Sequence, residues 1–286
     1  MEAVHRFGEL MRTRFPAACL ALLAGVTAPA MAKSPQPPSA AEAMRALCGL
    51  SDADAEGCTV EGQNISAWRT VEYTFDDAPR FTLLATVSED ADADSPQLSA
   101  PGDMLGLAQV SYQFRDGRWQ QTGRQFNFGS IAASGAAGNP PIVGEGEPLV
   151  QRALSSGMLI GLPIRRFEPG GISIAGYSMF RLAAGGSDGW TYAGDIDTGT
   201  DNGADCDGGG PQRPCYASSG TLRQLQVRTA GLPAWPEFEV VLSGTTVGDD
   251  GKVRPVTAED TTLWRFSKEA DGYVGVPRRC ARPKDC

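Results

Sequence analysis

A pair of alternating segments within residues 177–220 is the feature that most constrains how this chain can fold. Phe180 and Leu182 occupy alternate positions before a Gly-Gly-Ser-Asp-Gly segment, and Trp190 and Tyr192 occupy alternate positions after it. Alternation with a period of two gives each strand two distinct faces, and glycine supplies the positive φ angles that tight turns need. The segment therefore predicts a β-hairpin.

Similar alternating runs, separated by turn signals such as Asp116-Gly117, recur along most of the chain. We predict an all-β fold, an antiparallel β-sandwich or barrel of about eleven strands with few short helices, stapled by local disulfides. The helical candidates are Ala41–Leu50 and a turn at Pro148–Ser155.

The N-terminal residues have the layout of a secretory signal peptide. Arginines precede an apolar run, residues 15–26, and Ala30-Met31-Ala32 provides a cleavage pattern of small residues. The run is shorter than the ~18 residues of a membrane span. We predict a signal peptide over residues 1–32 with cleavage near Ala32, and Met11 is an alternative translation start. A Pro-rich linker, 33–40, and an exported β domain, 41–286, follow; two β units divided near 130–147 are an alternative.

The predicted mature chain is acidic. The full chain has a net charge of −9 at pH 7 and four lysines, and loss of residues 1–32 removes three arginines and two glutamates, which changes the charge to −10. Binding to a phosphate backbone depends on clustered lysine and arginine, so the composition argues against a nucleic-acid partner. A periplasmic or secreted location follows from the predicted signal peptide, without a membrane span in the mature protein.

The cysteines that follow residue 32 form three pairs that are close in sequence. An even number of cysteines in an exported chain indicates disulfides, and each short loop would restrict the unfolded chain. The predicted disulfides are Cys48–Cys58, Cys206–Cys215 and Cys280–Cys286.

The catalytic motifs of several enzyme classes are missing. His5 is the only histidine and lies in the predicted signal peptide, which excludes a Ser-His-Asp arrangement and an imidazole zinc site in the mature protein. Neither a Gly-x-Ser-x-Gly elbow nor a phosphate-binding loop is present. These absences favour a non-enzymatic protein; a glycosidase that uses two carboxylates is the enzymatic alternative.

An Asp-rich segment near the Cys206–Cys215 pair has two interpretations. Carboxylate oxygens on a glycine-containing loop suit Ca²⁺, although the spacing departs from that of an EF-hand. The other interpretation is a solvated acidic loop closed by a disulfide. The predicted calcium ligands are Asp195, Asp197, Asp201 and Asp205.

We expect an exported, non-enzymatic protein that binds another envelope protein, in the manner of an inhibitor or immunity-type protein. The missing histidine and the acidic charge motivate this expectation, and the Cys206–Cys215 loop is the first candidate contact. The alternative is a carbohydrate-binding or carboxylate-dependent glycan-active protein. That alternative predicts that Trp119, Trp190 or Trp235 is exposed in a groove, whereas burial of these residues would argue against it.

Overall fold

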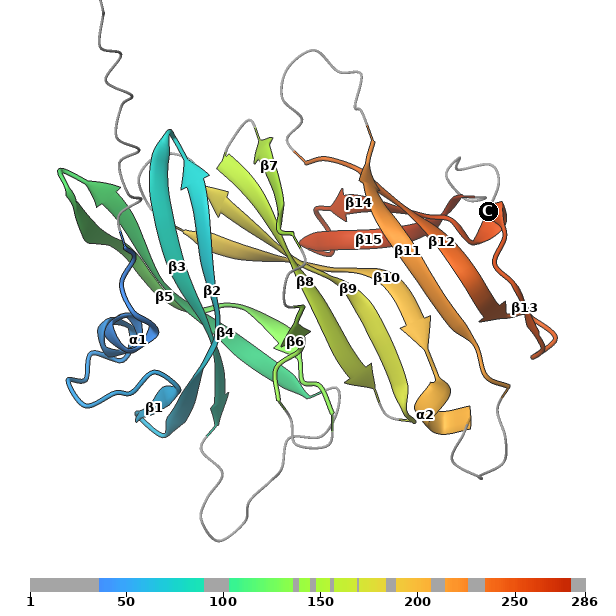
Figure 1. Ribbon diagram of the computed structural model, residues 1–286, viewed down its shortest axis with the longest axis horizontal. Helices are drawn as coiled ribbons and strands as arrows, with labels where there is room; N and C mark the ends of the chain where they lie inside the picture. The colour runs from blue at the N-terminus through green and yellow to red at the C-terminus, as the bar shows by residue number, and fades with distance from the viewer. Residues whose placement is uncertain are drawn as a thin grey trace, which may run out of the picture. The chain divides into compact units, whose positions relative to one another are not determined.

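A computed structural model describes residues 36–89, 103–135, 139–144, 148–154, 157–168, 170–183, 189–206, 214–225 and 235–278. Residues 35–286 form one compact unit. The predicted signal peptide and most of the predicted linker lie outside the described residues. The predicted all-β fold is confirmed, because two antiparallel sheets make up most of the described chain (Figure 1).

The first sheet has five strands in the order of the sequence, each antiparallel to the next. Helix α1 (Ala40–Cys48) covers one face of this sheet; a capping box between Ser39 and Glu42 begins it, and Gly49 in the left-handed conformation ends it. The strands are β1 (Gly57–Val60), β2 (Gln63–Phe75), β3 (Ala78–Glu89), β4 (Met104–Arg115) and β5 (Arg118–Ala132).

The second sheet has ten strands, with the main order β15-β14-β12-β11-β10-β9-β8-β6; β7 also pairs with β8, and β13 with β12. The helical turn expected at Pro148–Ser155 is strand β7 instead. The elements are β6 (Ile142–Val143), β7 (Val150–Leu154), β8 (Gly157–Glu168), β9 (Ile172–Ala183), β10 (Trp190–Asp201), α2 (Gly203–Cys206), β11 (Ala217–Gln224), β12 (Phe238–Val247), β13 (Val253–Pro255), the 3-10 helix η1 (Ala258–Asp260), β14 (Thr262–Ser267) and β15 (Gly272–Pro277).

The described residues therefore form fifteen strands rather than about eleven. The strands that the sequence pattern missed include β1, β6 and β7, which have two to five residues each. A period of two cannot be recognised over so few positions, because other patterns fit them equally well.

Both hairpins that the sequence indicated most strongly are present. Trp190 lies opposite Leu182, so β9 and β10 pair across the Gly-rich segment. Arg115 lies opposite Arg118, and the residues between them, Asp116 and Gly117, have φ angles of 52° and 75°. Positive φ at both central residues is the geometry of a type I′ turn, which Asp-Gly favours.

The two sheets share a hydrophobic core. Side chains of β2 to β5 pack against β8 to β10, and Phe180 and Trp190 are among the largest buried side chains. A second cluster lies beneath α1, and a third joins β8 to β10 to the strands from β12 onward. The chain passes from the first sheet to the second between Ala132 and Ile142. Because the sheets share a core, we expect them to unfold together.

Two of the three predicted disulfides are confirmed. Cys48–Cys58 ties the end of α1 to β1, and Cys206–Cys215 ties α2 to the residues before β11. Cys280 and Cys286 lie outside the described residues. Disulfides of this kind are typical of proteins from oxidising compartments. None of the helices in the described ranges combines the length and the hydrophobicity that a membrane crossing needs.

Candidate functional site

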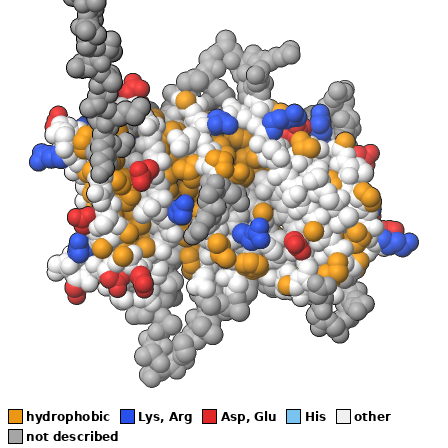
Figure 2. All heavy atoms as spheres, in the orientation of Figure 1, with side chains coloured by type: hydrophobic (Ala, Val, Ile, Leu, Met, Phe, Trp, Pro, Cys, Tyr) orange, Lys and Arg blue, Asp and Glu red, His pale blue; other side chains and the backbone are white. Residues whose placement is uncertain are grey.

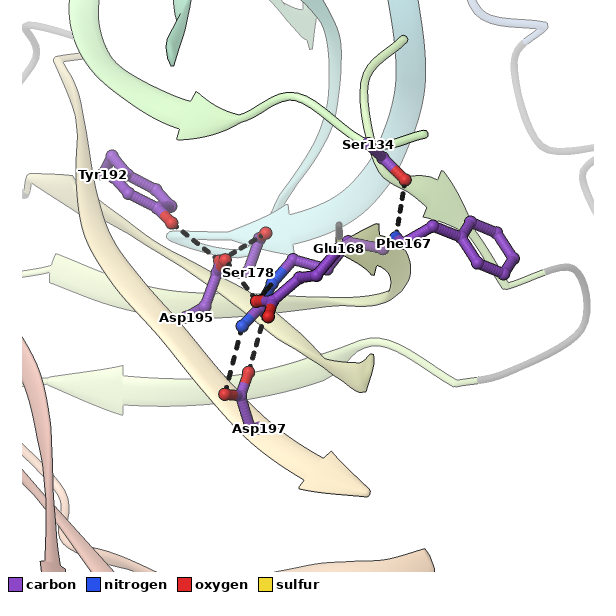
Figure 3. A network of polar contacts seen from close by, with 8 residues as sticks. Ser134, Phe167, Glu168, Ser178, Tyr192, Asp195 and Asp197 are labelled. Carbon is purple, nitrogen blue, oxygen red and sulfur yellow. Dashed lines mark hydrogen bonds and ion pairs between the residues drawn. The ribbon is translucent and has the colours of Figure 1, made fainter. Parts of the chain in front are cut away.

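Two of the predicted calcium ligands, Asp195 and Asp197, lie on strand β10, where an arginine from β8 binds them (Figure 3). The guanidinium of Arg166 donates two hydrogen bonds to the Asp197 carboxylate, at 2.8 and 3.1 Å. It also lies 3.6 Å from Asp195 and 3.5 Å from Glu168. Because β9 separates β8 from β10, this side chain links two strands that are not neighbours. We call Arg166, Glu168, Ser178, Tyr192, Asp195 and Asp197 the Arg166 cluster.

Asp195 is the most enclosed acid of the cluster. Its Oδ1 atom accepts hydrogen bonds from Tyr192 and from Ser178, each at 2.7 Å. Burial raises the pKa of Asp195, and the hydrogen bonds together with Arg166 oppose that shift only in part. Burial also raises the pKa of Tyr192, as does the neighbouring charge of Asp195. The tyrosine therefore stays protonated and acts as a donor.

The first of two irregularities in β10 places both aspartates on the face that carries Tyr192. The register shifts between Tyr192 and Asp195 and again between Asp197 and Gly199. Gly194 has a φ angle of 87°, which residues with a side chain rarely adopt. A bulge of this kind re-aims the side chains that follow it. Asp195 therefore lies on the same face as Tyr192, whereas strict alternation would place them on opposite faces.

The predicted calcium ligands do not lie together in one acidic loop, because Asp195, Asp197 and Asp201 belong to strand β10 and Asp205 belongs to α2. Asp195 and Asp197 belong to a strand and are bound by Arg166, and Asp201 accepts a hydrogen bond from the backbone N–H of Gly203. The side chain of Asp205 lies outside the described part of the chain. Within the described ranges, no three histidine, cysteine, aspartate or glutamate side chains are grouped so that they could hold a metal ion. Calcium binding stays a prediction.

The opposite face of these strands carries a groove of about 790 Å³. Its floor is a row of residues that lie directly opposite one another on successive strands, so their side chains share a face. The row runs across the strands, and nearly all of its central members are small. We call this feature the cross-strand groove, and its row consists of Ile142 on β6, Arg165 on β8, Ala175 on β9, Gly199 on β10, Ser219 on β11 and Ser243 on β12.

The ends of the groove differ in chemistry. Ile142 and Phe167 have exposed fractions of 58% and 39%. Arg165, whose side chain is also exposed, lies directly opposite Ile142 and two residues before Phe167 on β8. No hydrogen bond or ion pair joins the Arg165 side chain to any residue that the structure describes. Toward β12 the groove presents the hydroxyl groups of Ser219 and Ser243. One end is therefore apolar and cationic, and the other is neutral and polar.

The Cys206–Cys215 disulfide lies in the connection between two strands that line the groove. Asp201, at the end of β10, and Ala217, at the start of β11, line the groove and lie opposite each other. The disulfide closes the connection between these two strands. It therefore constrains the ends of β10 and β11, where Asp201 and Ala217 line the groove.

Small and neutral residues also dominate much of the surface nearby. Figure 2 shows one face of the molecule, and neutral polar side chains and backbone, drawn white, cover most of the part that carries β10 to β12 in Figure 1. Charged side chains are scattered there rather than gathered into one patch. A partner of that surface would meet backbone and hydroxyl groups more often than charges.

The tryptophans named for the carbohydrate interpretation do not line the groove. Trp190 is 2% exposed and lies in the core between the sheets. Trp119 is half-buried against the cluster beneath α1, and Trp235 stacks on Phe266 with 3.6 Å between ring centres. Their positions argue against a tryptophan-lined sugar groove.

The Arg166 cluster and the cross-strand groove occupy opposite faces of the same three strands, β8 to β10. Arg165 and Arg166 are consecutive, so one side chain enters the groove and the other binds the aspartates. The cluster, with its carboxylates already bound by donors, has a structural role: it fixes β8 and β10 beneath the groove. No family model and no curated protein matches the sequence, and no solved structure matches the fold.

Proposed function

We propose that this chain is an exported, non-enzymatic binding protein that holds a segment of another envelope protein in the cross-strand groove. The observation that carries the proposal is the groove floor, where small residues on neighbouring strands form a continuous row. Small side chains allow the backbone of a partner to approach closely. The half-exposed Ile142 and Phe167 supply apolar anchors of the kind that dominate binding energy in interfaces.

The residues that line the groove support binding better than catalysis. Asp201 is the one carboxylate among them in the described chain. Glycoside hydrolysis requires two carboxyl groups on opposite sides of the scissile bond. The mature chain that we propose also lacks histidine, the commonest general base. The groove therefore offers contacts for recognition but not an acid–base pair.

A glycan is the second candidate ligand, and one observation favours it. The groove has hydroxyl groups on Ser173, Ser219 and Ser243, and the rings of Tyr177 and Phe167 lie along the same face. Hydroxyls and aromatic rings are groups that sugars can contact. We rank the polypeptide first because the exposed Ile142 and the absence of tryptophan from the groove suit an apolar side chain better than a sugar.

We place the protein outside the cytoplasm, and in the periplasm if the host is Gram-negative. The predicted signal peptide over residues 1–32 supports export. The disulfides at Cys48–Cys58 and Cys206–Cys215 support an oxidising compartment. An inhibitor or immunity-type protein would act in that location.

A bulky side chain on the groove floor tests the proposal. Ser219 is exposed on β11, and tryptophan is well tolerated in strands, so we expect Ser219→Trp to fold normally but to fill the groove. Thr221→Trp is the matched control, because Thr221 is exposed on the same face two residues along and does not line the groove. Envelope proteins captured by the purified wild type would be compared quantitatively with those captured by each variant.

We expect Ser219→Trp to lose its protein partner and Thr221→Trp to keep it. If both variants capture the same proteins as the wild type, the groove is not the binding site. If the wild type captures no protein but is retained on peptidoglycan or another polysaccharide, and Ser219→Trp abolishes that retention, the glycan candidate replaces the polypeptide.

A further inference from the structure

We infer that the cross-strand groove selects an extended polypeptide segment by two charges: Arg165 binds an acidic side chain, and Asp201 binds a basic side chain three or four residues away. This inference rests on the proposed function and specifies which segment the groove takes. It follows from the direction of the groove, from the surroundings of Arg165 and from the position of Asp201.

The direction of the groove requires recognition through side chains. The floor crosses β8 to β12. The row residues of β8 to β11 already pair with a neighbouring strand on both sides, whereas Ser243 of β12 pairs with β11 on one side. The backbone donors and acceptors of the row residues on β8 to β11 are therefore used within the sheet. A segment that lies over β8 to β11 cannot add itself as another strand, so contacts to side chains must determine what binds there.

Arg165 is available to bind an anion. Its guanidinium has no partner among the described residues, whereas neighbouring Arg166 is bound by carboxylates. Ile142 lies directly opposite Arg165, and Phe167 lies two residues along on the same face. Apolar neighbours exclude water and strengthen a charge-assisted hydrogen bond, and the planar guanidinium can bind both oxygens of a carboxylate. The preferred residue at this end is acidic, with an aliphatic or aromatic neighbour in the segment.

Asp201 provides the opposite charge at a defined separation. Asp201 on β10 lies opposite Ser173 on β9, and Ser173 lies opposite Phe167 on β8. Asp201 is therefore two strands away from β8, at the level of Phe167, which is two residues beyond Arg165. Two strand spacings of about 4.8 Å and one step of about 6.7 Å place the two Cα atoms about 12 Å apart. An extended chain advances about 3.3 Å per residue, so this separation corresponds to three or four residues. Asp201 Oδ1 accepts from Gly203, and Oδ2 has no hydrogen-bond partner in the described chain.

Fluorescence anisotropy with defined peptides tests the inference. The probes are labelled peptides of about ten residues, each with leucine beside the first variable position, and two variable positions about four residues apart. Four peptides differ only at these two positions: the first carries Glu then Lys, the second Lys at both, the third Glu at both, and the fourth Gln at both. A further Glu and Lys peptide has adjacent charges. The proteins are the wild type, Arg165→Glu and Asp201→Asn, which keeps an oxygen that can accept from Gly203.

We expect the wild type to bind the spaced Glu and Lys peptide about tenfold more tightly than every other peptide, which corresponds to about 1.4 kcal/mol. Arg165→Glu should prefer the Lys and Lys peptide, because positions 165 and 201 would then both be acidic. Asp201→Asn should lose the advantage of lysine over glutamine in a peptide that retains glutamate. Equal binding of all peptides, or an unchanged preference in Arg165→Glu, would overturn the inference.

The proposed function can survive that failure. If Ser219→Trp abolishes capture of the partner but no peptide shows a charge preference, the groove binds a polypeptide by other contacts. If Ser219→Trp has no effect on capture and no peptide binds, both the inference and the proposed function are wrong.

Discussion

Replacing Trp190 by alanine is expected to lower the free energy of unfolding by about 4 kcal/mol, because it removes a large side chain from the core that joins the two sheets. Trp190 is 2% exposed. Its ring contacts Tyr73 and Phe180 edge-on, with ring centres 5.8 and 5.9 Å apart. Its indole N–H donates to Ser111 Oγ at 3.1 Å, so the substitution also removes a hydrogen-bond donor from a buried hydroxyl.

Urea unfolding at neutral pH would measure this loss. Trp119→Ala is a suitable control, because Trp119 is half-buried and its indole nitrogen has no hydrogen-bond partner in the described chain. We expect the control to cost less than half as much. A loss of about 1 kcal/mol or less for Trp190→Ala would mean that the two sheets are not held together by this core.

Replacing Arg166 by glutamine is expected to lower the free energy of unfolding by about 2–3 kcal/mol at pH 7, because removal of one partner leaves the enclosed carboxylate of Asp195 without a counter-charge. The side chain of Arg166 is 14% exposed, and that of Asp195 is 18% exposed. The neighbouring substitution, Arg165→Gln, is the control. It removes an exposed arginine that no described residue binds, so we expect a change within about 0.5 kcal/mol.

The effect of Arg166→Gln should depend on pH. The pKa of Asp195 is raised in the folded protein, and Arg166 limits that increase, so its removal raises the pKa of Asp195 further. A carboxyl group whose pKa is higher in the folded than in the unfolded state stabilises the fold as it gains a proton. The difference between wild type and variant should therefore shrink as the pH falls from about 7 toward the unfolded value of about 3.9. A difference that stays constant or grows on acidification would contradict the role assigned to the Arg166 cluster.

Local sequence signals predicted the hairpins and two of the disulfides. Asp116-Gly117 specifies a two-residue turn through its own backbone preferences, and the turn then sets the register of β4 and β5. The pairs Cys48–Cys58 and Cys206–Cys215 close loops of ten and nine residues, so proximity along the chain already favoured them. In each case the residues that determine the structure are neighbours in the sequence.

The candidate site could not be predicted in this way. Arg166 and Asp197 are 31 positions apart and meet across β9, because a bulge before Asp195 sets the face on which both aspartates lie. The groove floor depends on the register of several strand pairs, and a shift of one residue in any pair would break the row. Glycine, alanine and serine at single strand positions carry no signal until that register is known.

Site-specific photo-crosslinking would test most directly whether the cross-strand groove binds a partner protein. A photoreactive amino acid would replace Ser243, which lines the groove, or Ser66, which is exposed on β2 of the first sheet. Illumination would be carried out in cells that export the protein, and products would be identified by mass spectrometry. The account predicts a discrete adduct with one envelope protein from position 243 and none from position 66. Adducts of equal yield from both positions, or none from either, would contradict it.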